Sequence, residues 1–353
     1  MRSFTGCSSM PDASRLARWL EGVWYGGRGG GWLRPFGMLY RLLVAVRVAG
    51  YRLRLFRAYR AGIPVIVVGN ISVGGTGKTP LAAWVVNVLQ SAGHRPGIAT
   101  RGHGRQGGGV TQVQAWHGAA EVGDEPLLLA RRTGAPVCVA ARRADAVRVL
   151  QSAGCDVVVC DDGLQHLALG RDLEIAVVDG SRGLGNARVL PAGPLRETPS
   201  RLREVDFVVV NGAGPLTVPA GSTPTLRMTL SGDVARPVHA GAAPSRPLAD
   251  FAGRPVRAVA GIGNPARFFE HLRAAGLTPL EHPFPDHHAF QPGDFAFGDD
   301  LPVLMTEKDA VKCQSFADHR LWYVPVEASF VAEDAARLSA SLESLFEQGE
   351  RTR

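Results

Sequence analysis

The stretch IPVIVVGNISVGGTGKTP, residues 63–80, decides the fold of this chain. Its β-branched run at 65–68 predicts a buried strand, and the residues from Lys78 onward predict a helix. Between them, SVGGTGKT matches the last three positions of the phosphate-loop pattern G-x-x-x-x-G-K-S/T, with Ser72 in place of the first glycine. In such a strand–loop–helix unit, backbone N–H groups converge on phosphate oxygens at the helix start. The stretch therefore predicts a nucleoside triphosphate site.

The roles within this loop follow from its chemistry. Lys78 is expected to reach the β- and γ-phosphates, and the Thr79 hydroxyl is expected to bind Mg²⁺. Ser72 is tolerable if it needs no positive φ and if Gly74 and Gly75 supply the backbone freedom instead. The alternative is a glycine-rich turn that binds nothing. The predicted nucleotide-binding residues are Ser72, Val73, Gly74, Gly75, Thr76, Gly77, Lys78 and Thr79.

Strands and helices alternate on both sides of this loop. Continuous apolar runs predict strands at 63–70, 95–102, 135–141, 155–163, 173–180 and 205–212, with helices at 76–93, 125–134 and 144–154. Runs without alternation indicate a mainly parallel sheet of the P-loop NTPase type, covered by helices on both faces.

The chain length predicts more than one domain. The composition changes near 215–255, which is rich in proline and glycine and reads as a hinge or linker. A smaller α/β unit follows, with MTEKDAVK at 305–312 as a strand end and turn, and a final helix over about 331–347. We expect an N-terminal segment at 1–62, a P-loop domain at 63–230, and a C-terminal α/β domain at 231–353 that contributes to the cleft of the site.

The N-terminal part is strongly basic. Residues 22–120 hold eleven arginines, one lysine and no acid, in a chain with a net charge of +7. Such a segment predicts an anionic partner. FGMLYRLLVAVRVAGYRLRLFRAYR at 36–60 reads as one basic amphipathic helix bent at Gly50. It fits a helix lying on an anionic membrane, or a helix packed on its own domain with a solvated arginine face. No signal peptide and no apolar run of spanning length is present.

Lysine is rare, with three lysines against 36 arginines. A compact point charge is the property that arginine cannot replace, so each remaining lysine is a candidate functional residue. One is Lys78. Lys308 and Lys312 could pair with their neighbours Glu307 and Asp309, or contact a nucleotide or an anionic substrate.

Four further motifs carry candidate chemistry. VVVCDDG at 157–163 has the Walker B pattern, so Asp161 and Asp162 could hold Mg²⁺. VGDEP at 122–126 offers a carboxylate that either caps a helix or accepts the proton of a hydroxyl. LPAGPLRET at 190–198 is a stiff loop or a plain surface turn. In FPDHHAF at 284–290, Asp286 could orient either following histidine.

These motifs, together with ATRGHGR and TEKDAVK, resemble in their order the tetraacyldisaccharide 4′-kinases, the lipid A 4′-kinases of Gram-negative bacteria, over about residues 32–348. The resemblance implies ATP-dependent phosphorylation of the 4′-hydroxyl of a tetraacylated glucosamine disaccharide 1-phosphate, giving lipid IVA. It also implies Mg²⁺ and a peripheral location at the cytoplasmic face of the inner membrane. We expect a monomer that binds no nucleic acid.

The resemblance also implies residue roles. Asp124 matches the general base, and His287 its partner in a dyad. Acids around the metal, with Thr79, are Asp161, Asp162 and Glu197, and positions near the substrate or phosphate are Arg101, Glu125, Gln165 and Arg196. His103 departs from the usual tyrosine, and residues 1–30 have no counterpart in the family pattern.

Two other classes share part of these features. A membrane-bound NTPase switch would have the loop and the Walker B strand without VGDEP or PDHH. A nucleic-acid-binding ATPase would fit the basic charge, but the arginines gather on an amphipathic helix rather than among exposed aromatic residues.

Overall fold

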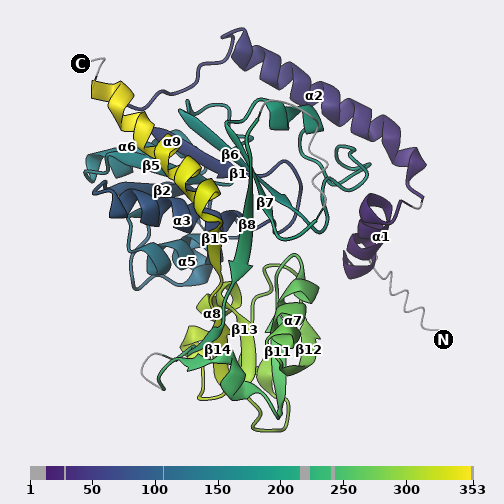
Figure 1. Ribbon diagram of the computed structural model, residues 1–353. Coiled ribbons are helices and arrows are strands. Elements are labelled where there is room, and N and C mark those ends of the chain that lie inside the picture. The colour runs from purple at the N-terminus through teal and green to yellow at the C-terminus, as the bar shows by residue number, and fades with distance from the viewer. Residues whose placement is uncertain (1–12, 28, 106, 215–222, 240–242, 351–353) are drawn as a thin grey trace, which may run out of the picture.

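The computed structural model describes residues 13–27, 29–105, 107–214, 223–239 and 243–350. Two sheets form the two parts of the molecule, one above the other in the view of Figure 1. The helices are α1 (Ala13–Tyr25), α2 (Arg34–Arg52), α3 (Lys78–Ser91), α4 (Ala119–Val122), α5 (Asp124–Thr133), α6 (Arg143–Ser152), α7 (Pro265–Ala274), α8 (Glu307–Cys313) and α9 (Ala332–Glu350).

The first sheet has nine strands in the order β15-β8-β7-β6-β1-β5-β2-β4-β3. Its strands are β1 (Val65–Gly69), β2 (Pro96–Thr100), β3 (Thr111–Gln112), β4 (Val137–Val139), β5 (Val157–Asp161), β6 (Leu173–Asp179), β7 (Phe207–Asn211), β8 (Thr225–Ser231) and β15 (Glu327–Phe330). All neighbours pair in parallel except the two edge pairs, β15 with β8 and β3 with β4. The predicted fold class, a mainly parallel α/β sheet of the P-loop type, is confirmed.

Helices cover both faces of this sheet, as the unbroken apolar strands predict. Residues of α3, α5 and α9 pack on one face with the inward side chains of β1, β5 and β7. On the other face, α6 packs together with the segments that follow β5 and β6. The central strands β1 and β5 are buried along their whole length, so their carboxyl ends are fixed points for the site.

The second sheet has six strands in the order β10-β9-β14-β13-β11-β12. They are β9 (Val234–Pro237), β10 (Arg246–Pro247), β11 (Pro255–Ala260), β12 (Thr278–Pro283), β13 (Val303–Thr306) and β14 (Leu321–Val324). α7 packs on one face and α8 on the other. The chain passes from the first sheet to the second between Ser231 and Val234.

Three details differ from the sequence expectations. The segment expected as a linker contains β8 and β9. MTEKDAVK continues after its strand as α8, because the Thr306 hydroxyl caps the helix by accepting from the backbone N–H of Asp309. β15 and α9 lie with the first sheet and not with the C-terminal unit, since β15 pairs with β8 and Leu338 and Leu342 enter the first core. A short half-buried strand carries no local signal of which sheet it joins.

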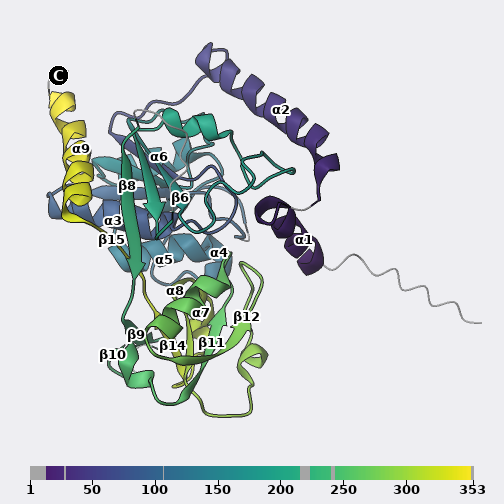
Figure 2. The same ribbon diagram turned by 45° about the vertical axis from the view of Figure 1, so that its right-hand side comes forward.

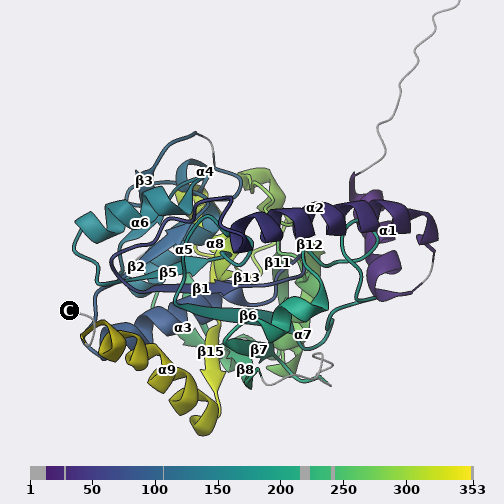
Figure 3. The same ribbon diagram turned by 90° about the horizontal axis from the view of Figure 1, so that it is seen from above.

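The basic helix is shorter than predicted. α2 ends at Arg52, and the chain folds back so that the backbone N–H of Phe56 donates to the carbonyl oxygen of Gly50. Arg54 takes a left-handed φ of 59° in this turn. α1 and α2 lie along the outside of the first sheet's domain (Figures 2 and 3). Within the ranges described above, no helix is long and apolar enough to cross a membrane.

Candidate active site

The phosphate loop connects β1 to α3 at the carboxyl edge of the first sheet. Gly74 and Gly77 have φ values of 103° and 94°, which favour glycine. Ser72 has no such φ: it is buried and forms an antiparallel bridge with Leu195. The expected freedom at Gly74 is confirmed, but Gly77 rather than Gly75 takes the second left-handed position.

The loop at 189–197 is joined to the phosphate loop by backbone hydrogen bonds. The backbone N–H of Val73 donates to Pro194 O (2.9 Å), and that of Arg196 donates to Ile71 O (2.6 Å). LPAGPLRET is therefore no plain surface turn. Its backbone pairing explains why no glycine is needed at position 72, and it carries Arg196 and Glu197 to the end of the sheet.

Asp161 is the last residue of β5, and Asp162 follows it next to the loop. Asp161 is fully buried, and neither of its carboxylate oxygens has a hydrogen-bond partner within the described part of the chain. Burial, with the nearby charge of Glu125, raises the pKa of Asp161 to about 7. Asp162 lies 3.5 Å from Lys78 Nζ and 3.1 Å from Arg196 Nη1. Burial alone would raise the pKa of Asp162, but these two cations lower it.

The environment of Asp161 fits a divalent cation. A buried, unpartnered carboxylate beside a phosphate loop lacks a positive charge, and hard cations prefer oxygen ligands. No three His, Cys, Asp or Glu residues gather into a protein-only metal cage in the portion of the chain described here. Mg²⁺ characteristically binds one or two carboxylates and takes its other ligands from phosphates and water, so one such acid is sufficient.

Both carboxylate oxygens of Glu197 have side-chain partners. Its Oε1 accepts from Gln165 Nε2 (2.7 Å), and Oε2 lies 3.5 Å from Arg201 Nε. The Gln165 side chain also donates to Asn70 O (3.0 Å), and the backbone carbonyl oxygen of Gln165 accepts from Arg47 of α2. This network connects the basic helix to the phosphate loop.

Asp124 and His287 meet between the two sheets. Asp124 opens α5 and is 6% exposed, and its Oδ2 lies 3.0 Å from His287 Nδ1. Its other oxygen accepts from the backbone N–H of Glu125, so one carboxylate serves both the helix start and the histidine. His287 has a left-handed φ of 60°, and Asp162 one of 52°. Non-glycine residues in this strained region are uncommon and cluster at functional sites.

The two partners shift each other's pKa. Burial alone would raise the pKa of Asp124, but the hydrogen bond from His287 and the charge of Lys308 lower it below its usual value. The same hydrogen bond raises the pKa of His287, while burial and Lys308 oppose that rise. The geometry favours an ionised aspartate, which is the form that can accept a proton.

Lys308, in the first turn of α8, contacts this pair. Its Nζ lies 3.0 Å from Glu125 Oε1 and 3.4 Å from both Asp286 Oδ1 and His287 Nε2. The expected pairing with Glu307 and Asp309 is wrong for Lys308. It holds for Lys312, whose Nζ lies 2.8 Å from Asp309 Oδ1.

A cavity of about 730 Å³ lies between the sheets and joins these groups. Lys78, Asp162 and His287 line it, and so does Arg101, which is exposed at its rim. The His103 ring lies 5.2 Å from the His287 ring, centroid to centroid, so the position that departs from the family pattern is beside the dyad.

The second sheet also contacts the phosphate loop directly. Arg267 of α7 donates to Asn211 Oδ1 (2.7 Å), and Asn211 Nδ2 donates to Thr76 O (2.9 Å). A Cβ on Gly263 would lie 3.0 Å from the backbone nitrogen of Gly75, so glycine permits this close approach. The position of the second sheet is thereby linked to the shape of the loop.

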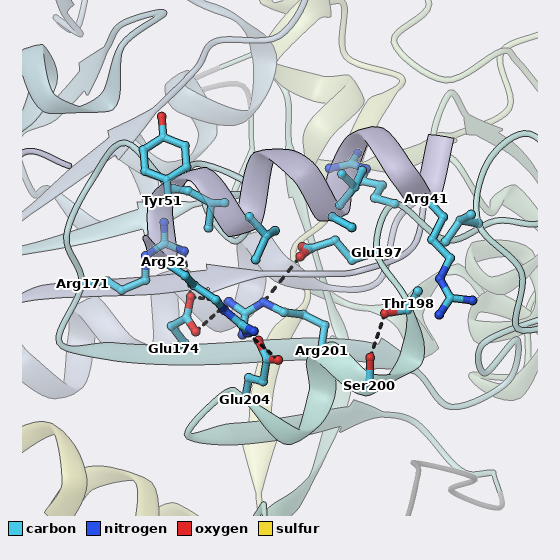
Figure 4. Close-up of a pocket in the computed structure, with 16 residues that line it drawn as sticks. Arg41, Tyr51, Arg52, Arg171, Glu174, Glu197, Thr198, Ser200, Arg201 and Glu204 are labelled. Atoms are coloured by element: carbon cyan, nitrogen blue, oxygen red, sulfur yellow. Dashed lines mark hydrogen bonds and ion pairs between the residues drawn. The ribbon is translucent and has the colours of Figure 1, made fainter. Parts of the chain in front are cut away.

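A second cavity of about 610 Å³ lies beneath α2. Figure 4 shows its arginine and glutamate side chains below the helix, with Arg201 between Glu174 and Glu197. Val44, Val48 and Tyr51 supply apolar surface from α2. Arg196 lines both this cavity and the cleft between the sheets, so the two spaces meet at the loop 189–197.

Comparison with known proteins identifies the family. The family model described as tetraacyldisaccharide-1-P 4′-kinase matches residues 31–347. The chain belongs to this family. It is 52% identical over 314 residues to the tetraacyldisaccharide 4′-kinase of Alkalilimnicola ehrlichii, covering 89% of this chain and 92% of the relative. It is 48% identical over 340 residues to that of Methylobacillus flagellatus, covering 94% and 98%.

A solved family structure has the same fold. The crystal structure of LpxK from Aquifex aeolicus in complex with ATP superposes with a TM-score of 0.75 at 27% identity, covering 90% of this chain and 99% of that one. The predicted family and the prediction of an ATP-using kinase are confirmed. Residues before 31, which include α1, lie outside the match to the family model.

The structure brings the predicted site residues to one cleft and its edge, and it adds residues that the sequence did not single out. The predicted residues come from six separate segments: 72–79, Arg101, 124–125, 161–165, 196–197 and His287. The added residues are Arg143, whose Nη2 donates to the carbonyl oxygens of Asp161 and Asp162, together with Asn211 and Arg267. Lys308, which the scarcity of lysine did single out, also lies at this site.

Proposed function

We propose that this member of the tetraacyldisaccharide-1-P 4′-kinase family transfers the γ-phosphate of ATP to the 4′-hydroxyl of a tetraacylated glucosamine disaccharide 1-phosphate, forming lipid IVA. The observation that carries the proposal is the 3.0 Å contact between Asp124 Oδ2 and His287 Nδ1, because His287 lines the cavity that Lys78 of the phosphate loop also lines. A carboxylate that can accept a hydroxyl proton beside a phosphate site is what phosphoryl transfer to an alcohol requires.

The nucleotide side rests on the loop at 72–79. Its backbone N–H groups and Lys78 bind the β- and γ-phosphates, and Arg196 adds positive charge beside Asp162. Asp161 and Thr79 would hold Mg²⁺, with Asp162 next to them and Glu197 fixing Gln165 and Arg201 around the site. When bound, the ion neutralises phosphate charge that develops during transfer.

The acceptor side rests on Asp124. The 4′-hydroxyl gives its proton to Asp124 while its oxygen forms the new bond to the γ-phosphorus. The bond between that phosphorus and the β–γ bridging oxygen breaks, and ADP leaves with its electron pair. His287 keeps Asp124 oriented and ionised, and Glu125 and Arg101 border the space open to the acceptor.

The lipid reaches this site from the side of α2. Leu42, Leu43 and Val46 of α2 are each about 60% exposed, while Gly37 on the opposite side of the helix is buried against Ala192 and Val189. Such an outward apolar row on a basic helix fits an anionic membrane surface better than a solvated arginine face does. We propose a peripheral, monomeric enzyme at the cytoplasmic face of the inner membrane, with the cavity beneath α2 open to the lipid.

Transfer of ³²P from ATP to purified tetraacyldisaccharide 1-phosphate tests this function, with a reaction lacking acceptor as the control. We expect labelled lipid and little hydrolysis without acceptor. Asp124→Asn should lower kcat by about 10²- to 10⁴-fold, because general base catalysis is worth that much, and leave the Kd for ATP within about twofold. Turnover by Asp124→Asn at the wild-type rate would remove Asp124 from the mechanism.

A further inference from the structure

Lys308 lies where the two halves of the dyad meet. Its side chain is 17% exposed, and its ammonium faces groups from both sheets: Glu125 and Asp124 from α5, Asp286 and His287 from the loop after β12. Thr306 caps α8, which places Lys308 in the first turn of a helix that packs on α5. The lysine is therefore built into the contact between the two sheets.

We propose that Lys308 is a positioning residue of the dyad, which holds His287 as the neutral tautomer with its proton on Nδ1. This inference rests on the proposed function, in which Asp124 is the base. It assigns to Lys308 control over which form of His287 faces Asp124, and no contact with the reacting atoms.

The donors and acceptors of Lys308 and His287 determine the tautomer. A lysine ammonium has three donors and no acceptor. His287 Nε2, 3.4 Å from Lys308 Nζ, must therefore accept in this contact. A neutral imidazole has one donor and one acceptor, so the proton lies on Nδ1 and is donated to Asp124 Oδ2 at 3.0 Å. Ionised Asp124 is an acceptor only, so both ring nitrogens of His287 have a matching partner: Nδ1 donates to Asp124, and Nε2 accepts from Lys308.

The charges around His287 favour the same neutral form. His287 lies beside the carboxylates of Asp124 and Asp286 and the ring of His103, and the Lys308 ammonium contacts its Nε2. Asp286 Oδ1 lies 3.9 Å from His287 Nε2. Without Lys308, this carboxylate would favour a second ring proton, and an imidazolium between two carboxylates would make Asp124 a weaker base.

The shape of the ammonium explains why a lysine stands here in an arginine-rich chain. Its acceptors lie in different directions around one small charge, whereas the planar guanidinium suits two parallel bonds to one partner. The three carboxylates raise the pKa of Lys308 against the effect of burial, so it stays charged throughout the working pH range. Lys308→Arg therefore keeps the charge and disturbs the geometry. Comparing it with Lys308→Met separates the effect of the charge from the effect of the geometry.

The experiment measures kcat/KM for the lipid acceptor between about pH 5 and 9 in the wild type, Lys308→Met and Lys308→Arg. Loss of the charge should raise the pKa of His287. The acid limb of the profile, where kcat/KM falls at low pH, should then move to higher pH by about one unit, since a nearby charge shifts a pKa by this order. Lys308→Arg should keep the acid limb within about 0.3 unit and lower kcat by roughly tenfold. If Lys308→Met does not fold, Lys308→Gln has a predicted shift in the same direction.

The matched control is Glu307→Gln. It breaks the ion pair with Arg132 (3.3 Å), which crosses the same contact between α5 and α8 without touching the dyad. We expect its acid limb to stay at the wild-type pH. A limb that moves equally in Glu307→Gln and Lys308→Met would reduce Lys308 to a structural contact.

¹⁵N NMR of histidine-labelled protein, with His287 assigned by its loss in His287→Asn, gives a readout independent of turnover. The wild type should show the neutral form with the proton on Nδ1, and Lys308→Met the imidazolium at the same pH. An unchanged limb and tautomer in Lys308→Met would overturn the inference. If Asp124→Asn is inactive in that case, the proposed function stands; if Asp124→Asn is active, it is the proposed function that fails.

Discussion

The two sides of the cleft are built in opposite ways. The nucleotide side comes from short continuous runs at the ends of adjacent strands, since Val68 of β1 is in register with Asp161 of β5. The acceptor side joins Asp124 to His287, which are 163 positions apart and belong to different sheets. The comparison teaches that phosphate binding depends on one rigid sheet edge, whereas the proposed base depends on how the two sheets meet.

The largest effect predicted for the nucleotide side comes from a change at Gly77. Gly77→Ala places a methyl group against Asn211 Nδ2 at a left-handed φ, so the loop must move. We expect kcat/KM for ATP to fall by about 100-fold or more, because a strained and displaced loop loses several phosphate contacts at once. Isothermal titration with ATP measures the binding part of this loss.

Gly75→Ala is the matched control for that loop. A Cβ at Gly75 would meet no atom within 4 Å, and Gly75 does not occupy the left-handed region. Its loss should be much smaller than that of Gly77→Ala. Equal losses would show that any change in the loop is harmful and would contradict the specific role of Gly77.

A smaller effect is predicted where the second sheet contacts the loop. Arg267→Ala removes the donor to Asn211 and loosens the bond from Asn211 to Thr76. We expect KM for ATP to rise by about tenfold with kcat nearly kept, since one charged hydrogen bond is worth about 1.5–3 kcal/mol. Steady-state kinetics with varied ATP measures the change.

Arg273→Ala on the same helix is its control, because Arg273 is exposed and pairs with Glu281 of its own sheet. KM for ATP should not change in this variant. A similar rise in both variants would mean that α7 acts through its stability and not through Asn211.

The smallest predicted effect concerns the approach of the lipid. The double variant Leu42→Ser with Leu43→Ser removes apolar surface from the outward side of α2. We expect KM for the lipid in anionic vesicles to rise several-fold while KM for ATP stays constant, because membrane binding scales with buried apolar area. Leu280→Ser, at an exposed leucine of β12, should change neither. Unaltered lipid KM in the α2 variant would contradict membrane contact by this surface.

The sequence predicts the nucleotide side well because its signals are local. An apolar strand, a glycine-rich loop and Lys78 fix the ends of β1 and α3 with no knowledge of distant residues. One detail differs: Gly77 rather than Gly75 is left-handed, and Gly77 is the N-cap residue of α3.

The acceptor side is less accessible to sequence reasoning. Asp124 and His287 were matched through family motifs, and no local pattern states that they touch. Lys308 bonds to Glu125, which is 183 positions away, so its neighbours in sequence were misleading partners. The end of α2 at Arg52 depends on Phe56 folding back onto Gly50, a tertiary contact that helix periodicity does not encode.

The central claim is that Asp124 and His287, from two sheets, act as one unit. A double-mutant cycle with Asp124→Asn, His287→Asn and the combined variant tests it most directly, with kcat for phosphoryl transfer to the lipid as the measurement. The account predicts that the combined variant is about as slow as the slower single variant, because residues that act as a unit are non-additive. Losses that multiply would show two independent residues and contradict the account.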